Sequence, residues 1–285
     1  RAASPPGPAM TSSLLVFTTD FGLSDPYAGV MKGVALSINP GLSFIDLTHQ
    51  ISPQNVAQGS FLLGLNHHYF PEDAIHVAVV DPGVGTDRRS VLLTAPWGRF
   101  VAPDNGLLTG VISGYLALQP EAAGPVDLPE GLTAVHLTNP DYWRHPVSHT
   151  FHGRDIFTPV AAHLSLGVEP EGLGEVVRSL FYLPMPKPIN HAGTITGQVI
   201  YQDTYGNLVT NIPADSLPTA ESVEVRIKGH SIVGLSRTFN DDNYANDSGL
   251  IALTASHGYL ELALANGNAA VLLSASEGEV VQVVT

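Results

Sequence analysis

The sequence has no cysteine and few basic residues, and each shortage excludes a class of protein or site. Without cysteine, the chain forms no disulfide, offers no thiol nucleophile and holds no cysteine-ligated metal. Only 12 Lys and Arg residues stand against 26 Asp and Glu residues, which gives a formal net charge of −14. Nucleic-acid binding requires clustered basic residues, so we expect no nucleic-acid partner. A run of about 18 apolar residues is also lacking, and we therefore predict no membrane span.

The composition that remains is typical of a well-packed, loop-rich globular protein. Of 285 residues, 44% are hydrophobic and 13% are charged, with 28 Gly and 22 Pro. This length suits one large domain or two ordinary ones. The first ten residues lack the apolar middle of a secretory signal, and we interpret residues 1–12 as a disordered extension with Met10 as the native start. The lack of disulfides is compatible with the cytoplasmic location that we expect.

Strand and helix patterns alternate through the first two-thirds of the chain. Such alternation predicts parallel βαβ units with right-handed crossovers. Residues 13–183 are therefore interpreted as an α/β domain with a mainly parallel sheet. The expected strands are 14–19, 42–47 and 74–80, the hairpin is 91–95 with 100–102, and the helices are 25–39, 54–69 and 156–166.

The pattern changes at a proline-rich stretch. Prolines at positions 184, 186 and 188 predict a stiff linker, which we place over residues 184–192. Short alternating segments separated by Gly and Asn turns follow, and they predict a small all-β domain over residues 193–285. The expected strands are 194–201, 208–212, 222–227, 230–233, 251–254, 259–263 and 280–284.

The segment Asp81-Pro82-Gly83-Val84-Gly85 is the strongest local signal for a site. It directly follows the apolar strand 74–80, so the carboxylate of Asp81 lies at the carboxyl end of that strand, where open α/β sheets bind ligands. The two glycines allow a sharp turn and a close approach to a ligand. Arg88 lies seven residues further on, and an arginine keeps a nearby carboxylate ionised. The alternative is an ion pair that merely ties down a loop.

Two further segments carry candidate polar groups. Asp20 ends the first strand before a glycine, where a carboxylate can accept hydrogen bonds from ribose hydroxyls or else cap the local turn. His152 precedes a helix and could accept a proton or orient water. For its neighbours Arg154 and Asp155 we favour a structural ion pair at the helix start. His145 and His149, close to His152, leave metal binding as an alternative.

The best candidate in the second domain is the turn around Tyr205. Its ring can stack on a base, and the amide of Asn207 can both donate to and accept from a purine edge. A plain hairpin turn with Gly and Asn at its tip is the alternative. The stretch from Ser256 to Glu261 also presents polar groups before a strand, and from the residues alone we interpret it as structural.

Five ordered motifs together resemble one family. They are TTDFG (18–22), VVDPGVG (79–85) with Arg88, TFHGRDIF (150–157), YGNLVTNI (205–212) and SHGYLELA (256–263). This set resembles the S-adenosylmethionine hydrolases, also called S-adenosylmethionine hydroxide adenosyltransferases, which are related to the fluorinases and chlorinases. The resemblance runs from Leu14 to Val284.

The resemblance implies a fold, an assembly and a reaction. The family has an N-terminal α/β domain and a β-barrel-like C-terminal domain. It forms homotrimers in which each active site lies between the N-terminal domain of one subunit and the C-terminal domain of its neighbour. Its members split S-adenosyl-L-methionine into adenosine and L-methionine, and they need no metal or other cofactor. The expected partners are thus a small-molecule substrate and two further copies of the chain.

The resemblance also implies roles for individual residues. Asp81, Arg88 and His152 match the residues that hold the water. Asp20 matches the ribose ligand, Tyr205 and Asn207 match the adenine contacts, and Asp203 and Ser256 match the methionine contacts. We also expect substrate contacts from Phe21, Asp25, Phe151 and Tyr259, in or beside the same motifs. Asp81 is the nearest base for the water, and His152 is the alternative because Arg88 should depress the pKa of Asp81.

Departures from the halogenases bear on the choice of nucleophile. Those enzymes carry a tyrosine at Asp81, a threonine at Val84 and Tyr-Ser at His152-Gly153. They also carry an arginine at His257, which leaves the contact to the methionine carboxylate open. An anionic carboxylate repels a halide but accepts a hydrogen bond from water, so these differences favour hydrolysis. The rivals are a halogenase, a non-catalytic sensor that needs only Asp20, Tyr205 and Asn207, and a metal-dependent hydrolase that uses the histidine cluster.

Overall fold

The computed structural model describes residues 13–218, 223–239, 245 and 248–284. They fall into two compact units, one reaching Pro184 and the other beginning at Met185. The extension expected over residues 1–12 lies outside the described residues. None of the helices in the described stretches combines the length and the apolar character that a membrane crossing demands.

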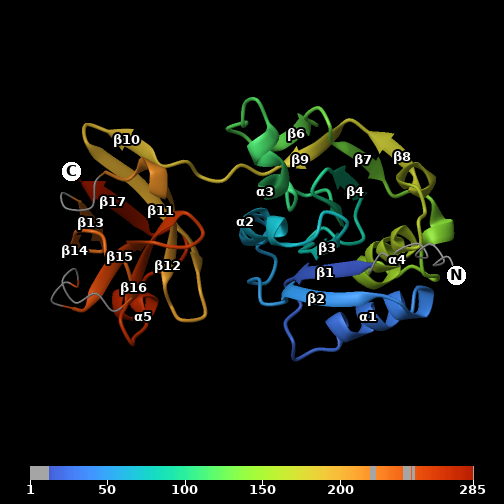
Figure 1. Ribbon diagram of the computed structural model, residues 1–285, viewed down its shortest axis with the longest axis horizontal. Helices are drawn as coiled ribbons and strands as arrows, with labels where there is room; N and C mark the ends of the chain where they lie inside the picture. The colour runs from blue at the N-terminus through green and yellow to red at the C-terminus, as the bar shows by residue number, and fades with distance from the viewer. Residues whose placement is uncertain (1–12, 219–222, 240–244, 246–247, 285) are drawn as a thin grey trace, which may run out of the picture. The chain divides into compact units, whose positions relative to one another are not determined.

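The first unit is built on a seven-stranded sheet, counted over its described residues (Figure 1). The strand order is β2-β1-β3-β5-β4-β7-β8. Strands β2, β1, β3 and β5 are parallel, whereas β4, β7 and β8 extend the sheet in antiparallel fashion. The strands are β1 (Leu14–Thr19), β2 (Ser43–Thr48), β3 (Ile75–Val79), β4 (Ser90–Ala95), β5 (Gly98–Pro103), β7 (Thr133–His136) and β8 (Glu175–Val177). The prediction of a mainly parallel α/β sheet is confirmed.

Helices cover both faces of this sheet, because its strands bury apolar side chains alternately on each side. Val77 packs in one core with residues of α1 and α4, and Ala78 packs in a second core with residues of α2 and α3. The helices are α1 (Tyr27–Ile38), α2 (Val56–Asn66), α3 (Thr109–Ile112) and α4 (Thr158–Ser165), and a separate ribbon pairs β6 (Gly124–Asp127) with β9 (Ser179–Tyr182). The parallel strands therefore end together at one edge of a buried sheet.

Two helices begin later than the sequence pattern predicts. Pro26 takes the N-cap position of α1, and no side chain caps this helix, so α1 begins at Tyr27 rather than at Asp25. Asn55 caps α2 by accepting a hydrogen bond from the backbone N–H of Gln58, so α2 begins at Val56 rather than at residue 54. Both differences arise because a polar residue followed by a proline marks a helix start only to within a few positions.

The second unit is built on an antiparallel sheet (Figure 1). The strand order is β14-β13-β17-β11-β12-β16-β15, with β10 paired to β11. A bridge between Ser236, beyond β14, and Leu253 in β15 nearly closes the barrel. The elements are β10 (Ile189–His191), β11 (Thr194–Gln202), β12 (Leu208–Pro213), β13 (Glu224–Ile227), β14 (His230–Val233), β15 (Leu250–Thr254), β16 (Tyr259–Leu264), α5 (Ala269–Leu273) and β17 (Val280–Val284). An all-β, barrel-like unit is thus confirmed, although β10 lies inside the segment expected to be a linker.

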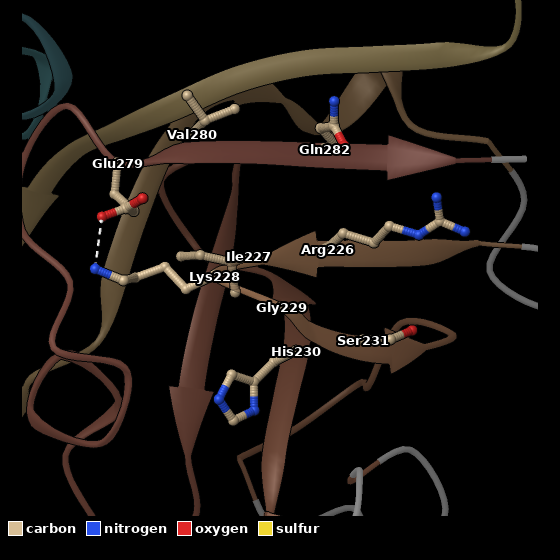
Figure 2. Close-up of a pocket in the computed structure, with 9 residues that line it drawn as sticks. All are labelled: Arg226, Ile227, Lys228, Gly229, His230, Ser231, Glu279, Val280 and Gln282. Atoms are coloured by element: carbon tan, nitrogen blue, oxygen red, sulfur yellow. Dashed lines mark ion pairs between the residues drawn. The ribbon is translucent and has the colours of Figure 1, made fainter.

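A shallow cavity of about 460 Å³ lies along β13, β14 and β17 of this barrel (Figure 2). Lys228 and Arg226 line it, but each is paired with a carboxylate. The Lys228 ammonium lies 3.2 Å from Glu279 and donates to the backbone oxygen of Ser274, and Arg226 pairs with Glu224 at 2.5 Å. The positive charges of this cavity are therefore already compensated, and none of the residues expected in the site lines it.

Candidate active site

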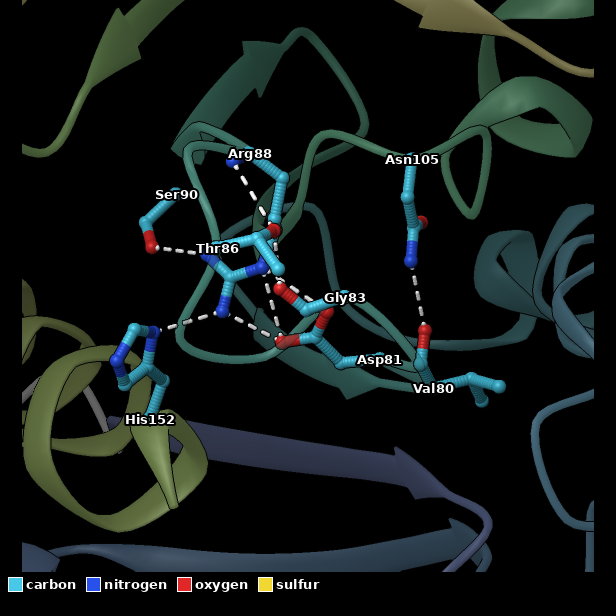
Figure 3. Close-up of polar contacts among 8 residues, drawn as sticks. All are labelled: Val80, Asp81, Gly83, Thr86, Arg88, Ser90, Asn105 and His152. Carbon is cyan, nitrogen blue, oxygen red and sulfur yellow. Dashed lines mark hydrogen bonds and ion pairs between the residues drawn. The ribbon is translucent and has the colours of Figure 1, made fainter. Parts of the chain in front are cut away.

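Asp81, Arg88 and His152 meet in the first unit, just beyond the carboxyl end of β3 (Figure 3). The Arg88 guanidinium donates to both oxygens of Asp81, from Nε at 2.9 Å and from Nη2 at 2.5 Å. Its Nη2 also lies 2.8 Å from His152 Nδ1, and Nη1 donates to Ser90 Oγ at 2.8 Å. The side chains of Asp81 and Arg88 are 5% and 10% exposed, so this pair is buried. One arginine thus orients both a carboxylate and an imidazole.

The contact with Arg88 fixes the tautomer of His152. A guanidinium only donates hydrogen bonds, so Nδ1 of His152 must accept, and the neutral ring carries its proton on Nε2. Burial, followed by the charge of Arg88, lowers the pKa of His152 below 6.5. The ring is therefore neutral at pH 7, with an N–H donor at Nε2.

Two hydrogen bonds and one close backbone contact hold the loop that carries Asp81. Asn105 donates from Nδ2 to the backbone oxygen of Val80 at 2.9 Å, and the hydroxyl of Thr86 donates to the backbone oxygen of Gly83 at 2.6 Å. Gly85 has a φ of +78°, and a Cβ there would lie 2.3 Å from the backbone oxygen of His149. The backbone of Gly85 thus approaches the segment before His152, and not a ligand as the sequence suggested. This contact brings the motif of Asp81 and the motif of His152 together.

A π-helical turn, η4 (Gly153–Phe157), follows His152 and leads into α4. The backbone N–H of Thr158 closes it by donating to Gly153. Asp155, fully buried at the start of this turn, accepts from Arg154 Nε at 2.7 Å and from the backbone N–H of Ser148 at 2.9 Å. The ion pair between Arg154 and Asp155 is therefore structural, as favoured from the sequence, and it supports the backbone that presents His152.

A cavity of about 360 Å³ opens beside this cluster, within the first unit. Asp20, Phe21 and Phe151 line it together with Asp81 and His152. The ring of Phe151 lies 5.8 Å from that of Phe21 and 5.2 Å from that of Tyr27, centroid to centroid. An aromatic wall thus stands beside the charged cluster.

The other half of the cavity is organised around Asp20. Its Oδ2 accepts a hydrogen bond from the backbone N–H of Gln54 at 2.7 Å. Gln54 and Tyr27 also line the cavity, and neither residue was predicted from the sequence. Neither residue lies in a recognisable motif. The only sequence signal for Gln54 is that the carboxylate of Asp20, at the end of a strand, needs a backbone N–H donor. Asp25, by contrast, is exposed and does not line the cavity.

In the second unit, Asp203, Tyr205 and Asn207 form the turn between β11 and β12. Asp203 Oδ1 accepts from the backbone N–H groups of Tyr205 and Asn207, and its Oδ2 accepts from Asn207 Nδ2 at 2.9 Å. Gly206 has a φ of +86° and packs so closely on Asn268 that a Cβ would lie 2.1 Å from it. The polar groups of Asp203 and Asn207 thus hold the turn, and the 78% exposed ring of Tyr205 projects from it.

These three residues line a cavity of about 1170 Å³ in the second unit, together with Ser256 and His257. His257 Nε2 lies 3.0 Å from Glu261 Oε2, and its Nδ1 accepts from the backbone N–H of Tyr259 at 3.3 Å. Both ring nitrogens of His257 are thus engaged within the unit. Tyr259 itself is not among the lining side chains, and burial raises its pKa.

The second cavity also contains Arg237 and the buried carboxylate of Glu261, which the sequence analysis did not single out as site residues. Arg237 lies in a loop with no recognisable motif. Glu261 is hidden in an apolar strand pattern, where an inward-pointing carboxylate gives no local signal.

The histidines of the first unit are separated by their contacts. His145 Nε2 lies 2.9 Å from the backbone oxygen of Pro140, whereas His152 faces Arg88. Within the described residues, no three His, Asp or Glu side chains are grouped so that they could hold a metal ion. The alternative of a metal site built from His145, His149 and His152 is therefore not assembled.

Comparison with known proteins gives a context for both cavities. Residues 15–174 match the family described as SAM hydroxide adenosyltransferase N-terminal domain, and residues 197–282 match the corresponding C-terminal domain. The chain is 39% identical over 272 residues to a Salinispora arenicola protein named (R)-S-adenosyl-L-methionine hydrolase, covering 94% of this chain and 96% of the relative.

More distant similarity extends to a fluorinase from an Actinoplanes species, with 28% identity over 243 residues, 75% of this chain and 76% of the relative. A crystal structure of an uncharacterized conserved protein from Thermotoga maritima is 35% identical and superimposes with a TM-score of 0.82. It covers 95% of this chain and 100% of the other. The sequence match thus spans both units, and each unit includes one of the two cavities that expected site residues line.

Proposed function

The chain belongs to the SAM hydroxide adenosyltransferase family, and on that premise we propose that it hydrolyses S-adenosyl-L-methionine (SAM) to adenosine and L-methionine. The observation that carries the proposal is the cluster of Asp81, Arg88 and His152 beside a cavity. It offers a fixed acceptor and a fixed donor to one water molecule. The anionic carboxylate of Asp81 repels a halide but accepts a hydrogen bond from water.

In the proposed reaction, one water is held between His152 and Asp81. Its oxygen accepts a hydrogen bond from Nε2–H of His152, and one of its hydrogens is donated to the carboxylate of Asp81. This arrangement aims an oxygen lone pair at the ribose C5′ carbon. The O–C5′ bond forms as the C5′–S bond breaks, and the electron pair of that bond stays on sulfur. Methionine leaves as a neutral thioether, so the leaving group needs no acid.

Positioning supplies most of the acceleration in this scheme. Holding a nucleophile in line with its target lowers a barrier by roughly 7–11 kcal/mol in favourable cases. Exclusion of bulk water also strengthens the attraction between the developing hydroxide and the sulfonium. Both effects fit a cavity of about 360 Å³ with an aromatic wall, since rigid apolar groups displace solvent without competing for the water.

Asp81 is the proposed base. The lone pair of His152 Nδ1 is directed at Arg88, and its Nε2 already carries a proton, so the ring has no free site for the proton of water. A carboxylate has about four acceptor positions, and Arg88 uses only part of them. The proton therefore passes to Asp81 and from there to solvent, while His152 serves as the donor that orients the water.

The remaining substrate contacts follow the family resemblance and the exposed groups. We assign the ribose hydroxyls to Asp20 and the adenine ring to stacking on Tyr205. The methionine end belongs to the region of Asp203 and Ser256. A homotrimer in which a neighbouring subunit completes each site, catalysis without a metal or cofactor, and a cytoplasmic location all stay predictions.

Incubation of the full chain with SAM in ¹⁸O-water tests the reaction and the bond that is cleaved. We expect label in the 5′-hydroxyl of adenosine and none in methionine. Parallel incubations with chloride or fluoride should give no 5′-halo-5′-deoxyadenosine, and added chelator should leave the rate unchanged. A halogenated product would favour the halogenase, loss of activity to chelator would favour a metal-dependent hydrolase, and binding without turnover would favour a sensor.

A further inference from the structure

A line of polar side chains, buried at Thr19 and His49, lies outside the cluster that holds the water. The hydroxyl of Thr19, the last residue of β1, lies 2.7 Å from Nδ1 of His49, the residue that follows β2. Nε2 of His49 lies 3.1 Å from Asp46 Oδ1, in ion-pair range although off the direction of a good hydrogen bond. The other oxygen of Asp46 accepts from Lys32 of α1 at 2.6 Å. Four side chains from two strands and a helix are thereby connected.

Hydrogen-bond accounting fixes the direction of this line. The carboxylate of Asp46 only accepts, so the nitrogen of His49 that faces it, Nε2, carries the ring proton. In that tautomer Nδ1 accepts from the hydroxyl of Thr19, whose Oγ1 also accepts from the backbone N–H of Phe21 at 3.2 Å. Burial would raise the pKa of Asp46, but its contacts with Lys32 and His49 hold that pKa below its usual value. His49 is therefore held at Nε2 by an ionised carboxylate, that of Asp46.

The same line fixes the backbone on which Asp20 stands. The backbone N–H of Phe21 donates to the Thr19 hydroxyl, and the N–H of Gly22 donates to the backbone oxygen of His49 at 2.7 Å. With Oδ2 of Asp20 held by Gln54, the carboxylate is constrained from both sides. Such a constraint reduces the entropy lost when a ligand is bound.

Thr19, His49 and Asp46 also resemble a nucleophilic triad, in which a histidine lies between a hydroxyl and a carboxylate. Burial argues against that role. Thr19 has no exposed surface and His49 is only 2% exposed, so no substrate atom reaches the hydroxyl. The hydroxyl proton is also already committed to His49. The line can act on a ligand only through the residues that it holds.

We propose that Thr19 and His49 are positioning residues that set the affinity for ribose hydroxyls by orienting Asp20. The inference rests on the proposed function in one respect, the assignment of Asp20 to the ribose. It predicts that disturbing the line weakens binding of a ribose that carries hydroxyls and spares a ribose that lacks them. A purely structural role would weaken both equally.

The test compares adenosine with 2′,3′-dideoxyadenosine by titration calorimetry on the full chain. Thr19→Val keeps the shape and removes the hydroxyl, and it should lower the affinity for adenosine by roughly five- to tenfold. The affinity for the dideoxynucleoside should stay within about twofold, and Thr19→Ser should restore the adenosine value. In turnover, Thr19→Val should raise KM for SAM by the same factor and leave kcat nearly unchanged.

A second variant guards against a misfolded first one. The side chain of Asp46 is 36% exposed, so the Asp46→Ala variant should fold. Its affinity for adenosine relative to 2′,3′-dideoxyadenosine should fall, but by less than in Thr19→Val. An unchanged ratio in both variants, or an equal loss for both nucleosides, overturns the inference. So does a wild-type chain that binds the two nucleosides equally, because Asp20 then has no ribose role. If the ratios behave as expected but SAM is not hydrolysed, the inference stands and the proposed function fails.

Discussion

Arg88 and Arg89 are adjacent in the sequence, and each holds one buried aspartate through Nε and Nη2. The Asp81 and Asp104 side chains are 5% and 6% exposed. The pairs differ in their other partners. Asp104 also accepts from the backbone N–H of Phe181, and Arg89 also donates to the backbone oxygen of Ser179, so that pair ties the loop to β9. The pair of Arg88 and Asp81 instead turns toward His152 and a cavity.

The comparison teaches that a buried arginine–aspartate pair does not by itself mark a site. In both pairs the charges are compensated and the geometry is fixed. Only the first pair keeps an acceptor and a neighbouring imidazole directed at open space. The two aspartates therefore form a matched set, in which the same substitution should separate chemistry from stability.

The largest effect is expected for Asp81→Asn. The amide cannot take the proton of water, so turnover should fall by roughly 10²–10⁴. Adenosine release, measured by chromatography, is the readout, and adenosine binding should persist. Asp104→Asn is the control and should keep turnover within about threefold, because its contacts lead away from the cavity. Equal losses of turnover in both variants would contradict the difference drawn between the pairs.

A binding residue outside both pairs should behave differently from Asp81. Tyr205→Ala removes an exposed ring assigned to adenine stacking, an interaction worth about 1–3 kcal/mol. We expect KM for SAM to rise by roughly 5- to 100-fold while kcat changes little. Tyr205→Phe keeps the ring and serves as the control. Steady-state kinetics on both variants decide, and a fall in kcat alone would remove the adenine assignment.

The stability effect should run opposite to the turnover effect. Asp104→Asn weakens two contacts to Arg89 and one to the N–H of Phe181, and Arg89 is 31% exposed. After allowance for solvent screening, we expect the free energy of unfolding to fall by about 1–2 kcal/mol. Urea titration with constant m-value measures it. A larger loss in Asp81→Asn than in Asp104→Asn would mean that the first pair also ties the fold.

The pH dependence should reveal the imidazole that only the first pair possesses. Burial and the charge of Arg88 lower the pKa of His152 below 6.5, so the neutral ring persists below that pH. Because the mechanism uses the neutral ring, any acid limb due to His152 in the profile of kcat/KM should lie below pH 6.5. His152→Asn should lack that limb. If activity rises as the pH falls through this range, the protonated ring is the active form.

The smallest effect is expected for an exposed pair. Lys228 and Glu279 lie 3.2 Å apart with side chains 35% and 30% exposed (Figure 2). Surface pairs contribute about 0–1 kcal/mol, so Glu279→Gln should change the free energy of unfolding by less than about 1 kcal/mol. Turnover should not change. A measurable loss of activity would show that the second unit transmits charge effects to the chemistry.

Local patterns in the sequence predicted the buried strands and the order of the two units. The apolar runs 14–19 and 74–80 lie within a few residues of β1 and β3, because burial on both faces requires an unbroken run. Helix starts were less accurate, as Pro26 and Asn55 show, and β10 formed within the proline-rich stretch because β11 offers it a partner.

Local patterns in the sequence could not predict contacts between residues far apart in the chain. Arg88 and His152 are 64 residues apart, and only the family resemblance suggested that they act together. The contact of Gln54 with Asp20 depends on where α2 begins, which no local signal sets. The engagement of Asn207 with Asp203 arises from the turn itself, and an amide pattern alone does not distinguish it from an amide free to read a base.

The π-helical turn η4 has a consequence for chain length. Its closing hydrogen bond spans one residue more than an α-helical bond, so the turn contains an extra residue between His152 and α4. Each residue of an α-helix advances the chain by about 100° around the axis. Removal of one residue from 153–157 would restore α-helical spacing and swing His152 away from Arg88. In this segment a substitution is therefore better tolerated than an insertion or deletion.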